Sequence, residues 1–214
     1  AAPLAVWLQG GDSVAATVFS VCLMAAILSY DAGGKRSFAG PYLMGSCRTF
    51  NILIGLCMAS PKFGEGGLPV AGMLMLAGGI GVYIAGITWF ARTETKDASH
   101  RGMLIFALTH MVAGIALVMT FPDACGEGRN WYLPSTTHFF LAIMILAIPV
   151  VRRAAIAISS PSPQRVQLTI KQGIFSLIVF DAGIAMMVAP VYFAIAILFL
   201  LVPTLTLGKW IYAT

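Results

Sequence analysis

The stretch from Tyr30 to Gly55, YDAGGKRSFAGPYLMGSCRTFNILIG, joins a short basic turn to an apolar segment that carries Arg48 and Asn51. In a helix that starts at Gly40, Arg48 lies about 12–13 Å along the axis, at ~1.5 Å per residue. If that helix crosses a membrane, Arg48 is too deep for its side chain to reach water comfortably. Arg48 is therefore a candidate functional residue. The alternative is an interhelical tie that bonds to backbone carbonyls or to a buried acid.

The composition of the whole chain is that of a membrane protein. Of its 214 residues, 59% are hydrophobic and 10% are charged, and the mean hydropathy is +0.89. The net charge of +5 comes from 13 Lys and Arg against 8 Asp and Glu. These basic residues fall in particular loops, so they indicate orientation rather than nucleic-acid binding. We therefore expect an all-α integral membrane protein of a bacterial inner membrane or an organelle membrane, with membrane lipid as a partner and no nucleic acid.

Seven apolar runs decide the predicted architecture, because each is long enough to cross about 30 Å of hydrocarbon, which takes ~20 helical residues. The runs cover residues 13–30, 40–59, 69–91, 103–121, 134–151, 170–189 and 190–209. Glycine and proline, the residues of turns, lie in the breaks between them. Residues 1–214 are thus predicted to form a single transmembrane helical domain.

Basic residues in the predicted loops set the orientation, because short cytoplasmic loops carry an excess of Lys and Arg. Basic loops alternate along the chain with loops poor in basic residues. The basic loops cover residues 31–39, 92–102 and 152–171, and the loops poor in basic residues cover 60–68 and 122–133. The alternation predicts an N-terminus outside the cytoplasm and a C-terminus on the cytoplasmic side.

Four polar residues lie inside the predicted spans at similar distances from the cytoplasmic ends: Arg48, Asn51, His110 and Asp181. Their shared depth, roughly 10–17 Å at ~1.5 Å per residue, predicts one polar cavity that opens to the cytoplasm and binds a ligand. Arg48 and Asp181 are the natural ion pair, since each alone would be costly in hydrocarbon. Alternatively, the pair only locks helices together, and His110 is a hydrogen-bonded interior histidine.

A second candidate site is the loop ARTETKDASHRG, from Ala91 to Gly102. Glu94 and Asp97 are three residues apart, so on a continuing helix their carboxylates would share a face and could hold Mg²⁺. The alternative is a solvated loop, in which nearby basic residues pair with these acids at negligible gain in stability.

Several short motifs occur in order over most of the chain. They are Tyr30-Asp31-Ala32, Lys35-Arg36, Gly40-Pro41, Met44-Gly45, Cys47-Arg48, Asn51, Gly55, Gly86-Ile87-Thr88-Trp89, Ala91-Arg92, Glu94, Val166-Gln167, Lys171, Gly173-Ile174 and Asp181-Ala182. In this combination the chain resembles the UbiA superfamily of intramembrane prenyltransferases, and within it the UbiA-like proteins of the bacterial ebo cluster.

The resemblance implies a helical bundle around a central cavity, in which two aspartate-rich loops bind a prenyl diphosphate through Mg²⁺. The prenyl group is then transferred to an aromatic or other lipophilic acceptor. Carried onto this sequence, Lys35 and Arg36 occupy the basic turn that faces the diphosphate, and Glu94 and Asp97 occupy the second acidic loop. Metal and basic residues neutralise the departing diphosphate, while an apolar cavity shields an allylic cation from water.

The chain also departs from the family pattern. The first acidic motif, an Asn-Asp followed by spaced aspartates, has no counterpart, and Ala91 and Thr93 stand at acid-rich positions of the second. In the family fold the N-terminus lies in the cytoplasm. A chain that starts outside is expected if the first two or three spans are missing, so this chain would correspond to the C-terminal two-thirds of that fold.

Two functions remain open on this pattern. The chain is a prenyltransferase if the missing N-terminal helices complete it. Alternatively, it is a non-catalytic accessory subunit of a larger membrane complex, with other membrane subunits as partners and a bound lipid, quinone or pigment. A transporter is a weaker third class, because no paired broken helices or matching halves occur in the sequence.

Overall fold

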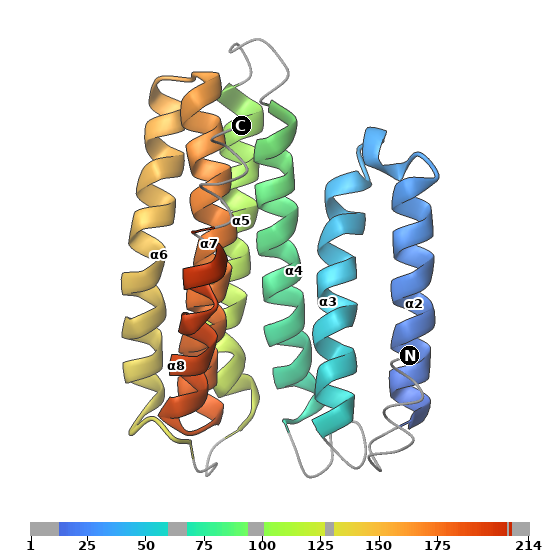
Figure 1. Cartoon of the computed structure of the whole chain (residues 1–214), viewed down its shortest axis with the longest axis vertical. Coiled ribbons are helices and arrows are strands. Elements are labelled where there is room, and N and C mark those ends of the chain that lie inside the picture. The colour runs from blue at the N-terminus through green and yellow to red at the C-terminus, as the bar shows by residue number, and fades with distance from the viewer. Residues whose placement is uncertain (1–12, 60–67, 94–100, 127–130, 205, 207–214) are drawn as a thin grey trace. The chain divides into compact units, whose positions relative to one another are not determined.

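The computed structural model describes residues 13–59, 68–93, 101–126, 131–204 and 206, which form an all-α architecture (Figure 1). Six of the helices are long and apolar enough to cross a membrane. They are α2 (Ser13–Asp31), α3 (Gly40–Ala59), α4 (Val70–Thr93), α5 (Arg101–Ala124), α6 (Thr136–Ser159) and α7 (Pro163–Val188). The short elements are η1 (Gly34–Arg36) and α8 (Val191–Phe199). The predicted all-α, multi-pass membrane architecture is confirmed.

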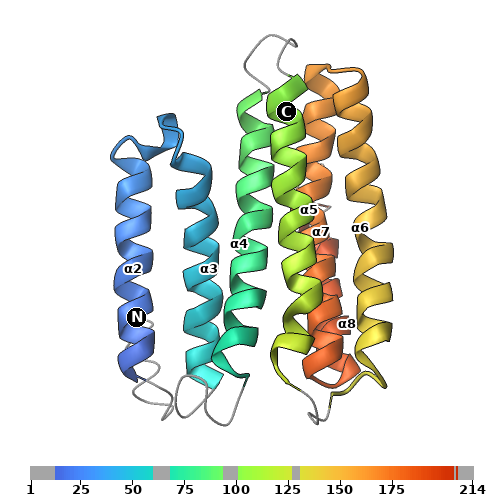
Figure 2. The same cartoon turned by 180° about the vertical axis from the view of Figure 1, so that it is seen from behind.

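The chain divides into two compact units, Ala1–Glu127 and Gly128–Thr214. In the first, α2, α3, α4 and α5 follow one another in a row, and each packs against the next, as two opposite views show (Figure 1 and Figure 2). Successive helices run antiparallel, so the end of α2, the η1 turn, the start of α3 and the end of α4 lie at one end of this unit. In the second unit, α7 packs against both α6 and α8.

Small residues let the helices of the first unit approach closely. A Cβ on Gly114 of α5 would lie 2.5 Å from the backbone nitrogen of Tyr83 and 2.6 Å from the carbonyl oxygen of Gly79, both on α4. A Cβ on Gly81 would lie 2.9 Å from the carbonyl oxygen of Gly45 on α3. Close backbone approach of this kind is how helices gain van der Waals contact in lipid, where no hydrophobic effect drives them together.

The loop predicted at 152–171 is wrong. Helix α6 continues to Ser159 and α7 already begins at Pro163, so the arginines of this stretch lie on helices. The turn is set by Ser162 and Pro163: the Ser162 side chain accepts a hydrogen bond from the Arg165 backbone nitrogen at 3.3 Å, and proline fits the first turn of a helix. Charged residues at the ends of a span do not stop a helix, because their side chains extend into the interface.

The seventh predicted span, 190–209, is only partly described. Helix α8 has 9 residues and begins after Pro190. With the helical residues that follow it, the apolar helical stretch runs from Val191 to Thr204, which is shorter than a full span. Residues 205 and 207–214 lie outside the described part of the chain.

Candidate functional site

The basic turn of the first unit is held against the end of α4 by Arg92. Its Nη1 donates a hydrogen bond to the carbonyl oxygen of Ser37 at 2.6 Å, and its Nη2 donates to the carbonyl oxygen of Lys35. These bonds engage the backbone of the turn and leave the side chains of Lys35 and Arg36 exposed. The cationic side chains of Lys35 and Arg36 are thereby presented from a fixed backbone at one end of the unit.

Two glycines permit this turn. Gly33 has φ +128°, a left-handed conformation that side chains rarely adopt, and it lets the chain reverse after α2. A Cβ on Gly40 would collide with the Arg92 guanidinium and would lie 2.6 Å from the carbonyl oxygen of Gly34. The sequence GGKRSFAG thus encodes both the reversal and the space that Arg92 occupies.

An aromatic cluster lies beside the basic turn. Its members, defined here as Phe38, Tyr42, Trp89, Phe106 and His110, come from three segments of the first unit. The ring centroids of Phe38 and Trp89 are 4.8 Å apart, those of Trp89 and Phe106 are 5.5 Å apart, and those of Phe106 and His110 are 4.3 Å apart. Such tilted and edge-on pairs are favourable geometries for aromatic rings.

Trp89 connects the aromatic cluster to the basic turn. The Arg92 guanidinium carbon lies 5.3 Å from the centroid of the Trp89 ring, within range of a cation–π interaction. Trp89 is 3% exposed, and its indole Nε1 has no hydrogen-bond partner among the described residues. Phe38 is 69% exposed, so the cluster has one buried wall and one open wall.

His110 is held by two hydrogen bonds within this cluster. Its Nδ1 lies 2.8 Å from the carbonyl oxygen of Phe106, one turn earlier on α5, and its Nε2 lies 3.0 Å from the hydroxyl of Tyr42 on α3. Both ring nitrogens of this partly buried histidine thus have hydrogen-bond partners within the cluster. Its role in ligand binding stays a prediction.

The other predicted ligand-binding residues lie on α3 and α7. Arg48 is partly buried on α3, and Asn51 is exposed. At about 100° per residue, Asn51 lies on the face of α3 opposite Tyr42. Asp181 is partly buried on α7, in the second unit, so its pairing with Arg48 stays a prediction.

No family model, curated protein or solved structure matches this chain. The resemblance to the UbiA superfamily therefore stays a prediction that rests on the motifs themselves.

The predicted metal ligands Glu94 and Asp97 lie outside the described residues. Among the described residues, no three His, Cys, Asp or Glu side chains lie together in a group that could hold a metal ion. The described part of the site thus offers cations and aromatic rings, but no acidic cluster that fits Mg²⁺.

Sequence reasoning missed the roles of Arg92, Trp89 and the other aromatic residues. Part of the signal was present, because Trp89 and Arg92 are three apart on α4 and Phe106 and His110 are four apart on α5, whereas Phe38 precedes α3. Residues at these spacings share one face of a helix. What the sequence did not indicate is that these faces meet.

Proposed function

We propose that this chain is a UbiA-like membrane protein of the prenyltransferase type, and that its first unit binds a prenyl diphosphate. The diphosphate would lie at Lys35 and Arg36, with the prenyl chain against the aromatic cluster. The observation that carries this proposal is the position of Arg92, which bonds to the backbone of the basic turn while its guanidinium lies over Trp89. A cationic turn and an aromatic surface held side by side suit an amphiphile with an anionic head and an unsaturated tail.

The chemistry of prenyl transfer supports these roles. The bond between the first prenyl carbon and the diphosphate oxygen breaks, and the electron pair leaves with the diphosphate. Lys35 and Arg36 would orient the diphosphate and stabilise the charge that develops on it. Aromatic faces are negative at their centres, so the exposed rings of Phe38 and Tyr42 would favour an allylic cation while excluding water from it.

The described residues support binding and orientation of the diphosphate only. In the family, Mg²⁺ assists departure of the diphosphate, and in this chain such a site would have to draw on Glu94 and Asp97, outside the described residues. The alternative function, a non-catalytic accessory subunit that binds a lipid, quinone or pigment, therefore stays open.

A binding measurement tests the proposal. The full chain in nanodiscs is titrated with farnesyl diphosphate, and with farnesol as the matched ligand that lacks the anionic head. We expect Lys35→Gln/Arg36→Gln to weaken farnesyl diphosphate binding by about tenfold, or ~1.4 kcal/mol, and to leave farnesol binding unchanged. Lys171→Gln, which removes a cation from the second unit, is the control and should have no effect. Equal affinity of the double variant and the unmodified chain for farnesyl diphosphate would refute the proposal.

Turnover separates the two functions that remain. The same preparation is incubated with Mg²⁺, farnesyl diphosphate and a lipophilic aromatic acceptor, and release of diphosphate is measured. We expect binding without release, because one acidic pair does not provide a two-loop metal site. Robust release that Glu94→Ala or Asp97→Ala abolishes would instead establish the chain as an enzyme by itself.

A further inference from the structure

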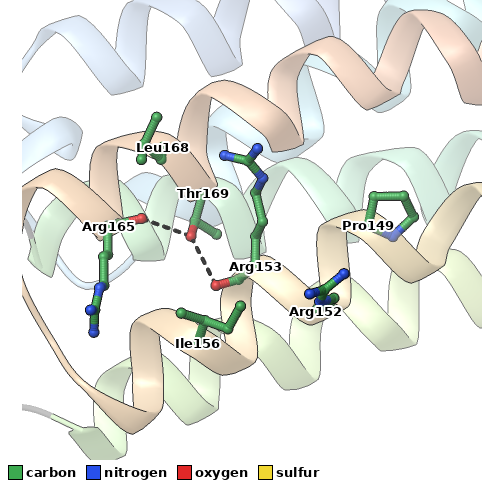
Figure 3. Close-up of a pocket in the computed structure, with 7 residues that line it drawn as sticks. All are labelled: Pro149, Arg152, Arg153, Ile156, Arg165, Leu168 and Thr169. Carbon is green, nitrogen blue, oxygen red and sulfur yellow. Dashed lines mark hydrogen bonds between the residues drawn. The ribbon is translucent and has the colours of Figure 1, made fainter.

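A groove of about 510 Å³ lies between the last turns of α6 and the first turns of α7, within the second unit (Figure 3). Thr169 ties the two helices together along it: its hydroxyl donates to the carbonyl oxygen of Arg165 at 2.9 Å and lies 3.4 Å from that of Arg153. Thr169 is 2% exposed, and these two hydrogen bonds satisfy its buried hydroxyl. The groove is thus bordered by two helices that are fixed to each other.

Three arginines line this groove, Arg152, Arg153 and Arg165, and no acidic residue lies among its lining residues. Arg165 turns back to the carbonyl oxygen of Ser160, to which its Nη1 donates at 3.0 Å. For Arg152 and Arg153 the structure shows no hydrogen bond from the guanidinium to any described residue. In Figure 3 the three guanidinium groups lie around Thr169 rather than at one point.

The charge of the groove is not balanced within the described part of its unit. The one carboxylate between residues 131 and 204 is Asp181, twelve residues beyond Thr169 on α7. At ~1.5 Å per residue this separation is about 18 Å along the helix, far beyond the ~4 Å of a salt bridge. The arginines therefore present a local excess of positive charge that calls for an anionic partner.

The rest of the lining is apolar and exposed. Ile156 is 43% exposed and Leu168 is 50% exposed, and both lie beside the arginines. Because α6 and α7 are long enough to span a membrane, we infer that the arginine-bearing end of this helix pair lies near the boundary between hydrocarbon and headgroups. Cationic and aliphatic side chains therefore share one groove at the level of the interface.

We propose that the groove between α6 and α7 binds an anionic phospholipid, with its headgroup attracted by the combined charge of Arg152, Arg153 and Arg165 and its acyl chain along Ile156 and Leu168. Arginine forks match phosphate oxygens, and basic grooves between membrane helices are suited to anionic headgroups. A free phosphate ion would use the same cations but would leave the aliphatic wall without a partner, so the amphiphile is the better fit. The proposal concerns only the second unit and is independent of the prenyl diphosphate site.

Native mass spectrometry of the full chain in detergent tests this assignment, with phosphatidylglycerol as the anionic probe and phosphatidylcholine as the neutral one. We expect phosphatidylglycerol to bind more tightly. Arg152→Gln/Arg153→Gln/Arg165→Gln should reduce that affinity by at least about tenfold, since each interfacial cation contributes roughly fivefold. Lys171→Gln is the matched control, because Lys171 lies on α7 outside the lining and stacks over Phe175 at 5.9 Å. It should leave the affinity unchanged.

Two further measurements keep the test decisive if the triple variant folds poorly. Binding of phosphatidylglycerol to the unmodified chain should weaken as salt increases, and replacing the three arginines by lysine should cost less affinity than replacing them by glutamine. Equal binding of the two lipids, an absence of salt dependence, or an equal loss in Lys171→Gln would overturn the assignment. Complete displacement of the lipid by equimolar inorganic phosphate would also overturn it, since the ligand would then be the free anion.

Discussion

The hydroxyl of Tyr42 lies 3.0 Å from Nε2 of His110, so a hydrogen bond joins α3 to α5 across the edge of α4. His110 Nδ1 lies 2.8 Å from the carbonyl oxygen of Phe106, and a carbonyl oxygen can only accept. The neutral tautomer that satisfies both bonds carries its proton on Nδ1, and its Nε2 accepts from the Tyr42 hydroxyl. The Phe106 carbonyl oxygen, which can only accept, thus sets the donor and acceptor roles of both ring nitrogens in this tautomer.

Removing the Tyr42 hydroxyl should weaken the first unit measurably. We expect Tyr42→Phe to lower the free energy of unfolding by roughly 0.6–1 kcal/mol, the usual contribution of a hydrogen bond between membrane helices. Unfolding in mixed micelles would measure it, and a double-mutant cycle with His110→Ala would isolate the pair. Tyr192→Phe, at an exposed tyrosine of α8, is the control. A coupling energy near zero would mean that this bond does not stabilise the fold.

The close contact of α4 and α5 predicts opposite outcomes for two glycines. A Cβ on Gly114 would lie 2.5 Å from the Tyr83 backbone nitrogen, whereas a Cβ on Gly78 would meet nothing within 4 Å. Backbone atoms cannot rotate away, so Gly114→Ala should destabilise the chain by about 1–3 kcal/mol. Gly78→Ala should be neutral or stabilise it by up to ~1 kcal/mol, because alanine is the better helix former. Thermal unfolding in detergent would rank the two, and similar effects would contradict the packing described.

Arg92 should control access to the backbone of the basic turn. Arg92→Gln removes the bonds to the Lys35 and Ser37 carbonyls, so the turn should open more often and trypsin should cleave after Lys35 and Arg36 about tenfold faster. Mass spectrometry of the fragments measures this. Arg92→Lys should not restore protection fully, since an ammonium lacks the planar fork that reaches both carbonyls. The control Lys171→Gln should leave the cleavage rate at this turn unaltered; if Arg92→Gln does so too, the turn is held by other contacts.

The sequence predicted the helices well where length and hydropathy decide the outcome. The first four apolar runs correspond to α2, α3, α4 and α5, with ends within a few residues. It failed at 152–171, where clustered charge suggested a loop. The local stop signals at Ser162 and Pro163 were a better guide than charge, because arginine is a good helix former and its long side chain reaches water from the end of a span.

The candidate site was predictable only in part. The basic character of Lys35 and Arg36 was visible in the sequence, and so was a polar histidine at position 110. The aromatic cluster was not, because spacing shows which residues share a helix face but not which faces pack together. The sequence predicts Arg92 at the start of a loop, whereas its role depends on the space that Gly40 leaves, which becomes evident only in three dimensions.

The predicted orientation is testable by cysteine labelling. The chain has four cysteines, and those in the described structure form no disulfide, so they can be replaced by serine or alanine to give a labelling background. Single cysteines at 35, 96 and 152 should then react from the cytoplasmic side, and those at 62 and 129 from the other side. An impermeant maleimide applied to intact cells and to inverted vesicles distinguishes them. Labelling of positions 62 and 96 from the same side would disprove the alternation.

The last prediction concerns Arg48 and Asp181, which are both partly buried in helices long enough to span a membrane. We predict that they approach each other directly or through one water, since an ion facing lipid without a partner would bear a penalty of several kilocalories per mole. Asp181→Asn and Arg48→Gln should each lower the melting temperature in detergent. The double variant should recover part of the loss, because no buried charge then remains without its counterion.

A ligand-binding role for these residues would give a different result. The single variants would then change which lipids or other small molecules co-purify with the chain, while its melting temperature would move little. Lys171→Gln, which removes one charge from the same helix as Asp181, controls for the effect of net charge. Additive losses in the double variant, together with an unchanged set of co-purifying molecules, would show that Arg48 and Asp181 act separately. The polar cavity predicted from their shared depth would then be ruled out.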